Sequence, residues 1–100
     1  MLKTSMEFKR GILFIRLKGD LNKNTIRGVI DRNFKYIVLN IDDMYSIDSY
    51  SIKYLNKIYR LYEENKNKFI ICDKFNTSNK LLSDIPKINR EYDAFKLLRG

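Results

Sequence analysis

The sequence contains no histidine, no tryptophan, one cysteine and one proline among its 100 residues. Without an imidazole, Ser-His and Cys-His catalytic pairs are excluded. A single cysteine cannot form an internal disulfide, and no cluster of histidine and cysteine exists to bind zinc. We therefore expect a protein that is not an enzyme and that has no cofactor and no metal.

Long hydrophobic runs are also missing. No stretch approaches the roughly 18 apolar residues of a membrane-spanning helix, and residues 1–10 lack the apolar core of a signal peptide. Together with the single cysteine, this predicts a cytoplasmic protein without a membrane partner. The length of 100 residues and the hydrophobic content of 44% predict one domain over residues 1–100.

The charge balance is basic, with 20 Lys and Arg against 12 Asp and Glu and a net charge of +8. Clustered basic side chains neutralise phosphates, so a small basic nucleic-acid-binding domain is an alternative interpretation. The basic residues are nevertheless spread along the chain with acids between many of them, and no arginine-rich arm is visible. A solvated basic surface is the simpler interpretation.

Apolar spacing predicts alternating strands and helices. The nearly continuous apolar runs at 36–41 and 69–72 are typical of strands covered on both faces, whereas 49–65 has helical spacing. The expected elements, in chain order, are strands at 6–8 and 12–17 joined by a turn at 9–11, a short helix at 24–33, a strand at 36–41, a helix at 49–65, a strand at 69–72, a helix at 77–85, a short edge strand at 88–92 and a terminal helix at 93–98. This order predicts an α/β domain with a mostly parallel central sheet, an N-terminal β-hairpin and helices packed against the sheet.

Each predicted helix has an apolar stripe that should face the sheet. In the helix at 49–65 the inward residues are Ile52, Leu55, Ile58, Tyr59 and Tyr62, and the outward ones include Lys53, Lys57 and Arg60. In the shorter helices the inward residues are Ile26, Val29 and Ile30, then Leu81, Leu82 and Ile85. Gly19-Asp20 and Asp42-Asp43 are expected to end their strands, and Cys72 is expected to be a small buried hydrophobe.

The segment at 42–52 carries the most functional information. A buried strand ends in Asp42-Asp43, a loop follows at 44–47, and Asp48 or Ser49 can cap the strongest helix. Ligands of open α/β sheets bind at the carboxyl ends of strands, and a helix start offers free N–H groups. A phosphorylated hydroxyl there would act as a charge switch, whereas plain capping is the simpler interpretation. The three aspartates could also be a magnesium site, although acids that cap loops are common.

The order of elements resembles the STAS domain, the module of sulphate transporters and anti-sigma-factor antagonists. Its apolar-Asp-Ser-Ser-Gly run, which opens a long helix, corresponds to Ile47-Asp48-Ser49-Tyr50-Ser51. Its Gly-x-Leu-Asp strand end has a counterpart in Gly19-Asp20-Leu21-Asn22. The resemblance covers roughly residues 6–98 and implies a regulatory module that binds a protein partner, an anti-sigma factor or a related kinase-like regulator.

Three positions depart from the family pattern. The family's second serine, which accepts phosphate, is Tyr50 here; its glycine is Ser51, and its aspartate is Asn22. The resemblance implies a docking surface around 19–22 and 44–54. Its partner-binding residues would be Gly19, Asp20, Leu21, Asn22, Tyr45, Asp48, Ser49, Tyr50, Ser51 and Lys53. A serine kinase site would misplace the longer tyrosine side chain, so Ser49 and Ser51 are the hydroxyls that could take over phosphorylation.

Overall fold

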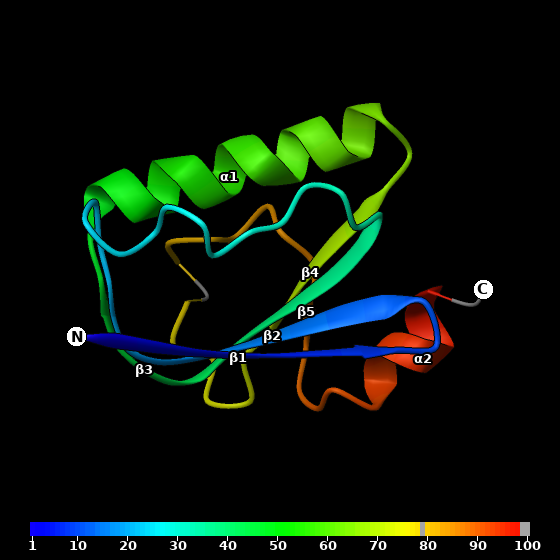
Figure 1. Cartoon of the computed structure of the whole chain (residues 1–100), viewed down its shortest axis with the longest axis horizontal. Helices are drawn as coiled ribbons and strands as arrows, with labels where there is room; N and C mark the ends of the chain where they lie inside the picture. Colours follow the sequence, from blue (N-terminus) through cyan, green and yellow to red (C-terminus); the bar gives the residue numbers. More distant parts are fainter. Residues whose placement is uncertain (79, 99–100) are drawn as a thin grey trace.

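The computed structural model describes residues 1–78 and 80–98 and is organised around a mixed sheet with the strand order β1-β2-β3-β4-β5 (Figure 1). The strands are β1 (Leu2–Lys9), β2 (Ile12–Leu21), β3 (Tyr36–Ile47), β4 (Lys68–Cys72) and β5 (Lys87–Ile88). The helices within the described part of the chain are α1 (Ser49–Glu64) and α2 (Asp93–Leu98). The predicted fold class is confirmed.

The N-terminal strands form the expected hairpin. β1 pairs antiparallel with β2 through a two-residue turn at Arg10-Gly11. Both turn residues have positive φ angles, 53° and 83°, which is the geometry that matches the twist of tight hairpins. The other three pairs of neighbouring strands are parallel: β2–β3, β3–β4 and β4–β5. The chain therefore joins the two strands of each of these pairs by a crossover connection.

Helices cover both faces of the sheet, which explains the uninterrupted apolar strands. α1 lies over one face, and α2 lies on the opposite side (Figure 1). Leu55, Ile58 and Tyr62 of α1 are buried in the larger core cluster, while Lys53, Lys57 and Arg60 are exposed as expected. The second cluster places Ala94 and Phe95 of α2 against apolar side chains of β2, β3, β4 and β5.

The predicted helix at 24–33 is wrong. This segment forms a series of turns, although its three apolar residues, Ile26, Val29 and Ile30, are buried as expected. Side chains of Asn22 and Thr25 bond to nearby backbone groups and compete with helical hydrogen bonds. Gly28 then adopts a φ of 80°, which interrupts any right-handed helix.

The predicted helix at 77–85 is also wrong, and its position 79 lies outside the described residues. The segment forms turns because the buried carboxylate of Asp73 accepts hydrogen bonds from the backbone N–H groups of Thr77 and Ser78 (3.1 and 2.8 Å). Leu82 and Ile85 are buried as expected, whereas the Leu81 side chain is 46% exposed. The turns of this segment, rather than a helical repeat, therefore determine which of its apolar side chains are buried.

Strand ends differ from the predictions as well. β2 runs through Gly19 and Asp20, and β3 continues past Asp42 and Asp43 to Ile47, because the two strands keep pairing through two register shifts. The strand predicted at 88–92 is reduced to Lys87–Ile88. The chain turns away there, and the Glu91 carboxylate accepts hydrogen bonds from Arg16 and Asn40 (2.7–2.9 Å).

Candidate functional site

The candidate site lies where β2 and β3 end side by side and α1 begins. Asp20 lies opposite Ser46, and Leu21 lies opposite Ile47. Parallel strands bring their carboxyl ends to one edge of a sheet, and α1 starts one residue after Asp48 at this edge. The structure thus brings together the segments 19–22 and 44–54 that are distant in the sequence.

Asp48 joins these segments. One carboxylate oxygen accepts the backbone N–H of Ser51 (2.8 Å) and caps α1, while the other accepts the backbone N–H of Lys23 (3.0 Å). Its own N–H donates to the carbonyl of Leu21 (3.1 Å). The hydrogen bond from Ser51 is the main reason that the pKa of Asp48 is held below its usual value. Asp48 is therefore an ionised cap that orients α1 against the end of β2.

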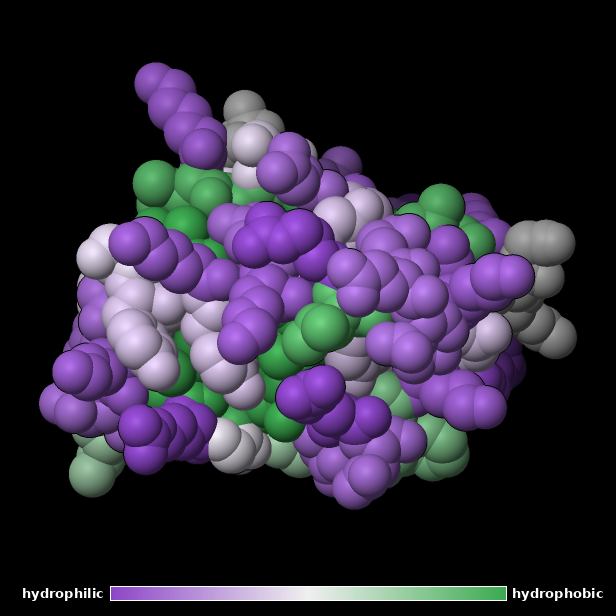
Figure 2. Space-filling model, turned by 90° about the horizontal axis from the view of Figure 1, so that it is seen from above, coloured by the Kyte–Doolittle hydropathy of each residue, from purple (hydrophilic) through white to green (hydrophobic). Residues whose placement is uncertain are grey.

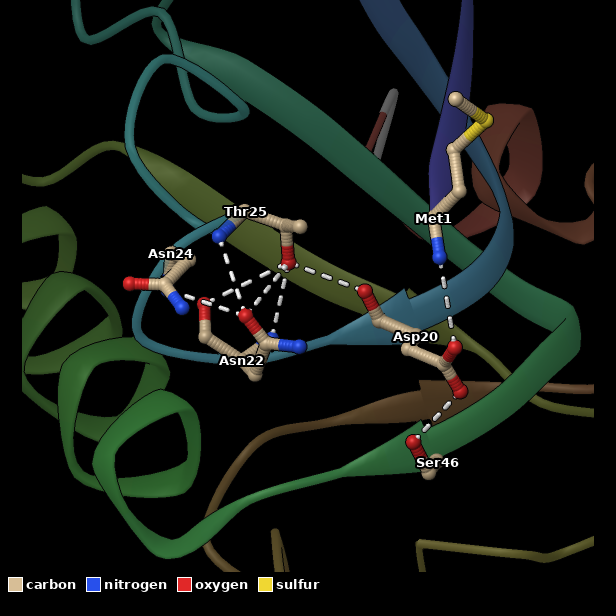
Figure 3. A network of polar contacts seen from close by, with 6 residues as sticks. All are labelled: Met1, Asp20, Asn22, Asn24, Thr25 and Ser46. Atoms are coloured by element: carbon tan, nitrogen blue, oxygen red, sulfur yellow. Dashed lines mark hydrogen bonds and ion pairs between the residues drawn. The ribbon is translucent and has the colours of Figure 1, made fainter.

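A second polar network surrounds Asp20 (Figure 3). The Ser46 hydroxyl donates to one carboxylate oxygen (2.7 Å), and the Met1 amino group lies 3.5 Å from the other. The bond from Ser46 is the main cause of the lowered pKa of Asp20. The Thr25 hydroxyl donates to the Asp20 carbonyl oxygen (2.9 Å), so the network ties β3 and the loop after β2 to the same residue.

Asn22 shapes the loop that follows β2. Its side-chain oxygen accepts the backbone N–H groups of Asn24 (2.9 Å) and Thr25 (3.2 Å), as Figure 3 shows. This is a side-chain turn of the type that asparagine and aspartate both form. The asparagine that departs from the family's aspartate thus has a local structural role, and it fills that role without a charge.

The predicted binding residues divide into an exposed set and a buried set. Tyr45 and Tyr50 are 71% and 41% exposed, and Ser49 and Lys53 are exposed beside them. Three of the predicted residues are buried: Gly19, Leu21 and Ser51. Three others are half-buried, and their side chains accept the hydrogen bonds described above: Asp20, Asn22 and Asp48. The exposed set therefore offers a partner more side-chain surface than the buried and half-buried residues do.

Gly19 is required by the backbone. Its φ is 118°, and a Cβ built on it would lie 2.1 Å from the carbonyl oxygen of Met1. Any side chain there would push the first residues of β1 away from β2. This glycine, which corresponds to the family's strand-end glycine, allows the close approach of two backbones at the edge of the site.

The two serines at the start of α1 have different environments. Ser49 is exposed, whereas Ser51 is fully buried and its hydroxyl has no hydrogen-bond partner among the described residues. Ser51 stands where the family has glycine, in the first turn of the helix against the core. A kinase reaching this helix start from solvent would therefore meet Ser49 and not Ser51.

Sequence reasoning missed a hollow on the outer surface of α1. Tyr50, Lys53, Tyr54 and Lys57 line it. Their spacing of three and four residues along a helix would have revealed the shared face. Seen from above, this side of the molecule is mostly hydrophilic, with small hydrophobic areas between polar side chains (Figure 2). The hollow extends the exposed set along α1 by one cation, Lys57, and one aromatic ring, Tyr54.

The alternative of a magnesium site finds no geometric support. Asp42 and Asp43 lie within β3, and the extended strand carries the chain roughly 16–20 Å from them to Asp48. One oxygen of Asp42 instead accepts the backbone N–H of Lys74 (2.9 Å). Within residues 1–78 and 80–98, no group of three or more acidic, histidine or cysteine side chains is arranged to hold a metal ion.

Comparison with known proteins gives a sequence relative and several structural ones, while no protein-family model matches the chain. The chain is 29% identical over 102 residues to an anti-sigma F factor antagonist of Paenibacillus polymyxa, a match that covers 92% of this chain and 87% of that protein. The solved structure of the anti-sigma factor antagonist SpoIIAA in its unphosphorylated form matches with a TM-score of 0.73 and 19% identity, over 98% of this chain and 99% of that one. An anti-sigma factor antagonist from Mycobacterium paratuberculosis matches with a TM-score of 0.72 and 15% identity, over 100% and 96% of the two chains.

Proposed function

We propose that this chain, which has the STAS fold of the anti-sigma factor antagonists and resembles them in sequence, is a non-catalytic regulatory module that binds a protein partner. The partner is an anti-sigma factor or a related kinase-like regulator, and the role places the protein in the cytoplasm. Docking occurs at the carboxyl ends of β2 and β3 and the start of α1. Among residues 1–78 and 80–98, neither α1 nor α2 has the length and apolar content that a membrane-spanning helix needs.

The observation that carries this proposal is the exposed set of side chains on a rigid base. Tyr45 and Tyr50 lie on neighbouring elements, β3 and α1, and are 71% and 41% exposed. The backbone beneath these side chains is held in place by Asp48, whose carboxylate accepts hydrogen bonds from the N–H groups of Ser51 in α1 and of Lys23 after β2. Large aromatic side chains on a preorganised surface are typical anchors of protein interfaces.

The module works by constitutive docking rather than by a phosphate switch at Tyr50. A phosphate on the tyrosine ring would lie far from the N–H groups at the start of α1, whereas a phosphate on Ser49 would lie near them. The carboxylate of Asp48 already accepts the Ser51 N–H and would repel a phosphate nearby. Peptide mass spectrometry of protein isolated from its host tests this: partner binding by unmodified protein is expected, and substantial phosphate on Tyr50 would refute it. Phosphate on Ser49 would show a displaced switch.

Binding is tested by identifying the partner and then measuring its affinity. Affinity purification from the host with mass spectrometry names a candidate, and titration calorimetry of the two purified proteins follows. Truncating an aromatic anchor costs 1 kcal/mol or more in typical interfaces, so Tyr45→Ala and Tyr50→Ala should each weaken binding by about tenfold. Tyr92→Ala is the matched control because Tyr92 is 61% exposed and immediately precedes α2, on the opposite side of the sheet.

Salt dependence separates this function from nucleic-acid binding. Phosphate-driven binding weakens steeply between low and moderate salt, whereas an interface anchored by aromatic side chains changes less. Equal affinity loss in the tyrosine variants and the control, or binding only to nucleic acid with a steep salt dependence, would contradict the proposed docking surface. The comparisons support a regulatory protein over the nucleic-acid alternative.

A further inference from the structure

The outer edge of β1 is open. β1 pairs only with β2 among the described strands, over eight consecutive residue pairs without a register shift, and it contains no proline. A long edge without proline or a bulge can pair with another strand where the charges that it carries are matched. The opposite edge differs, since β5 has two residues. β1 is therefore the edge of this sheet with the capacity to add a strand.

The hairpin geometry shows which backbone groups point outward. In a two-residue hairpin the closing pair, here Lys9 and Ile12, is hydrogen-bonded, and bonded and non-bonded pairs then alternate along the strands. The bond from the Asp20 N–H to the Met1 carbonyl fits this alternation, because Met1 is also odd-numbered. The even-numbered residues Leu2, Thr4, Met6 and Phe8 thus direct their N–H and C=O groups away from β2.

We infer that two copies of this chain associate through β1, antiparallel about a two-fold axis that passes at Ser5. Two-fold symmetry requires that the pairing be reciprocal, and the outward groups require even residues to face even ones. With the axis at Ser5, Leu2 lies opposite Phe8 of the second copy, Lys3 opposite Glu7, and Thr4 opposite Met6. This inference does not rest on the proposed function.

Charge favours this register. Lys3 lies opposite Lys18 within the hairpin and has no ion-pair partner among the described residues. Like charges directly opposite each other destabilise a strand pair. Glu7 of the second copy supplies the missing negative charge, and symmetry forms the contact twice. An axis at Met6 would instead place Lys3 opposite Lys9, and an axis at Thr4 would leave Phe8 and Lys9 unpaired.

Apolar surface favours the same register. Met6 and Phe8 are 48% and 60% exposed on the face that also carries α1, and the Phe8 ring contacts Phe34 with a centroid distance of 5.2 Å. Pairing with the second copy places Leu2 beside Phe8 and Thr4 beside Met6 on this face. Aromatic and aliphatic cross-strand neighbours stabilise sheets, so association covers the exposed apolar side chains of β1.

Disulfide trapping tests the register. Ser5 would face itself as a non-hydrogen-bonded pair with a Cα–Cα distance of about 4.5 Å, within the range that a disulfide bridges. Ser5→Cys should therefore form a covalent dimer on mild oxidation, in high yield. Thr4→Cys is the matched control, because the two cysteines would be roughly 8 Å apart across the strand pair. The native Cys72 is buried and does not compete.

Charge exchange tests the same contact without a covalent bond. Sedimentation equilibrium of the unmodified chain should show a reversible monomer–dimer equilibrium, and Lys3→Glu or Glu7→Lys alone should weaken it by about tenfold. The double variant restores opposite charges and should recover the original dimerisation. Glu7 also pairs with Arg16 (2.9 Å), so recovery in the double variant, rather than loss in one single variant, identifies the contact between copies.

Three results would overturn the inference. The first is a chain that stays monomeric up to millimolar concentration. In that case, the open edge of β1 could add only a strand from another protein. The second is equal trapping of the cysteines at positions 4 and 5. The third is failure of the charge exchange to restore dimerisation. Partner binding at Tyr45 and Tyr50 is measured separately, so failure of either proposal leaves the other standing.

Discussion

Replacing Leu55 by alanine tests the packing of α1, the helix on which the candidate site depends. The Leu55 side chain is fully buried in the cluster between α1 and the sheet. Removing three buried carbons costs about 2.4 kcal/mol of transfer free energy, and the residual cavity raises the total to about 3–5 kcal/mol. A chain of this size has a free energy of unfolding of about 5–15 kcal/mol, so Leu55→Ala should remain folded but lose a large share of it.

Urea and thermal unfolding, followed by far-ultraviolet circular dichroism, measure the change. One kcal/mol corresponds to about 4–8 °C in a domain of 60–100 residues, so we expect Tm to fall by at least about 12 °C. Leu81→Ala is the matched control, because it removes the same atoms from a half-exposed side chain and should cost less than about 1 kcal/mol. Equal losses in the two variants would refute the orientation of α1 and the turn structure at 80–82.

Gly19→Ala should destabilise the chain by about 1–3 kcal/mol more than Gly11→Ala, since both have positive φ but only a Cβ at Gly19 strikes backbone; comparable unfolding midpoints for the two would contradict this. The hydrogen bond from Arg16 lowers the pKa of Glu91 from its usual 4.5. The Glu91 carboxylate therefore binds a proton more readily in the unfolded chain than in the folded one, and acid should destabilise the protein below about pH 4.5. Glu91→Gln should make the fall of Tm between about pH 5 and 3 shallower, and an unchanged slope would exclude this contribution. Burial raises the pKa of Cys72 to about 12, so a thiol reagent at neutral pH should label it only on unfolding, and rapid labelling of folded protein would show that the thiol is accessible.

Local sequence signals predicted the strongest elements of the fold. The apolar runs at 36–41 and 69–72 lie within β3 and β4, and the helical spacing at 49–65 matches α1 to within one residue. Asp48 is the cap because aspartate there can accept a backbone N–H three residues on. These features depend on residues close together in the chain, and for that reason sequence alone was sufficient to predict them.

Long-range contacts decided the rest. β2 and β3 extend beyond their predicted ends because each continues to pair with the other, and the buried carboxylate of Asp73 organises turns where apolar spacing indicated a helix. From the sequence, Ser49 and Ser51 were equally good candidates for phosphorylation, whereas packing of α1 on the sheet exposes the first and buries the second. The sequence by itself therefore determined the positions of the five strands, of α1 and of α2, together with the residues near the candidate site. Only the tertiary structure decided which of these residues are exposed and which predicted helices are turns, because both depend on contacts between segments distant in the chain.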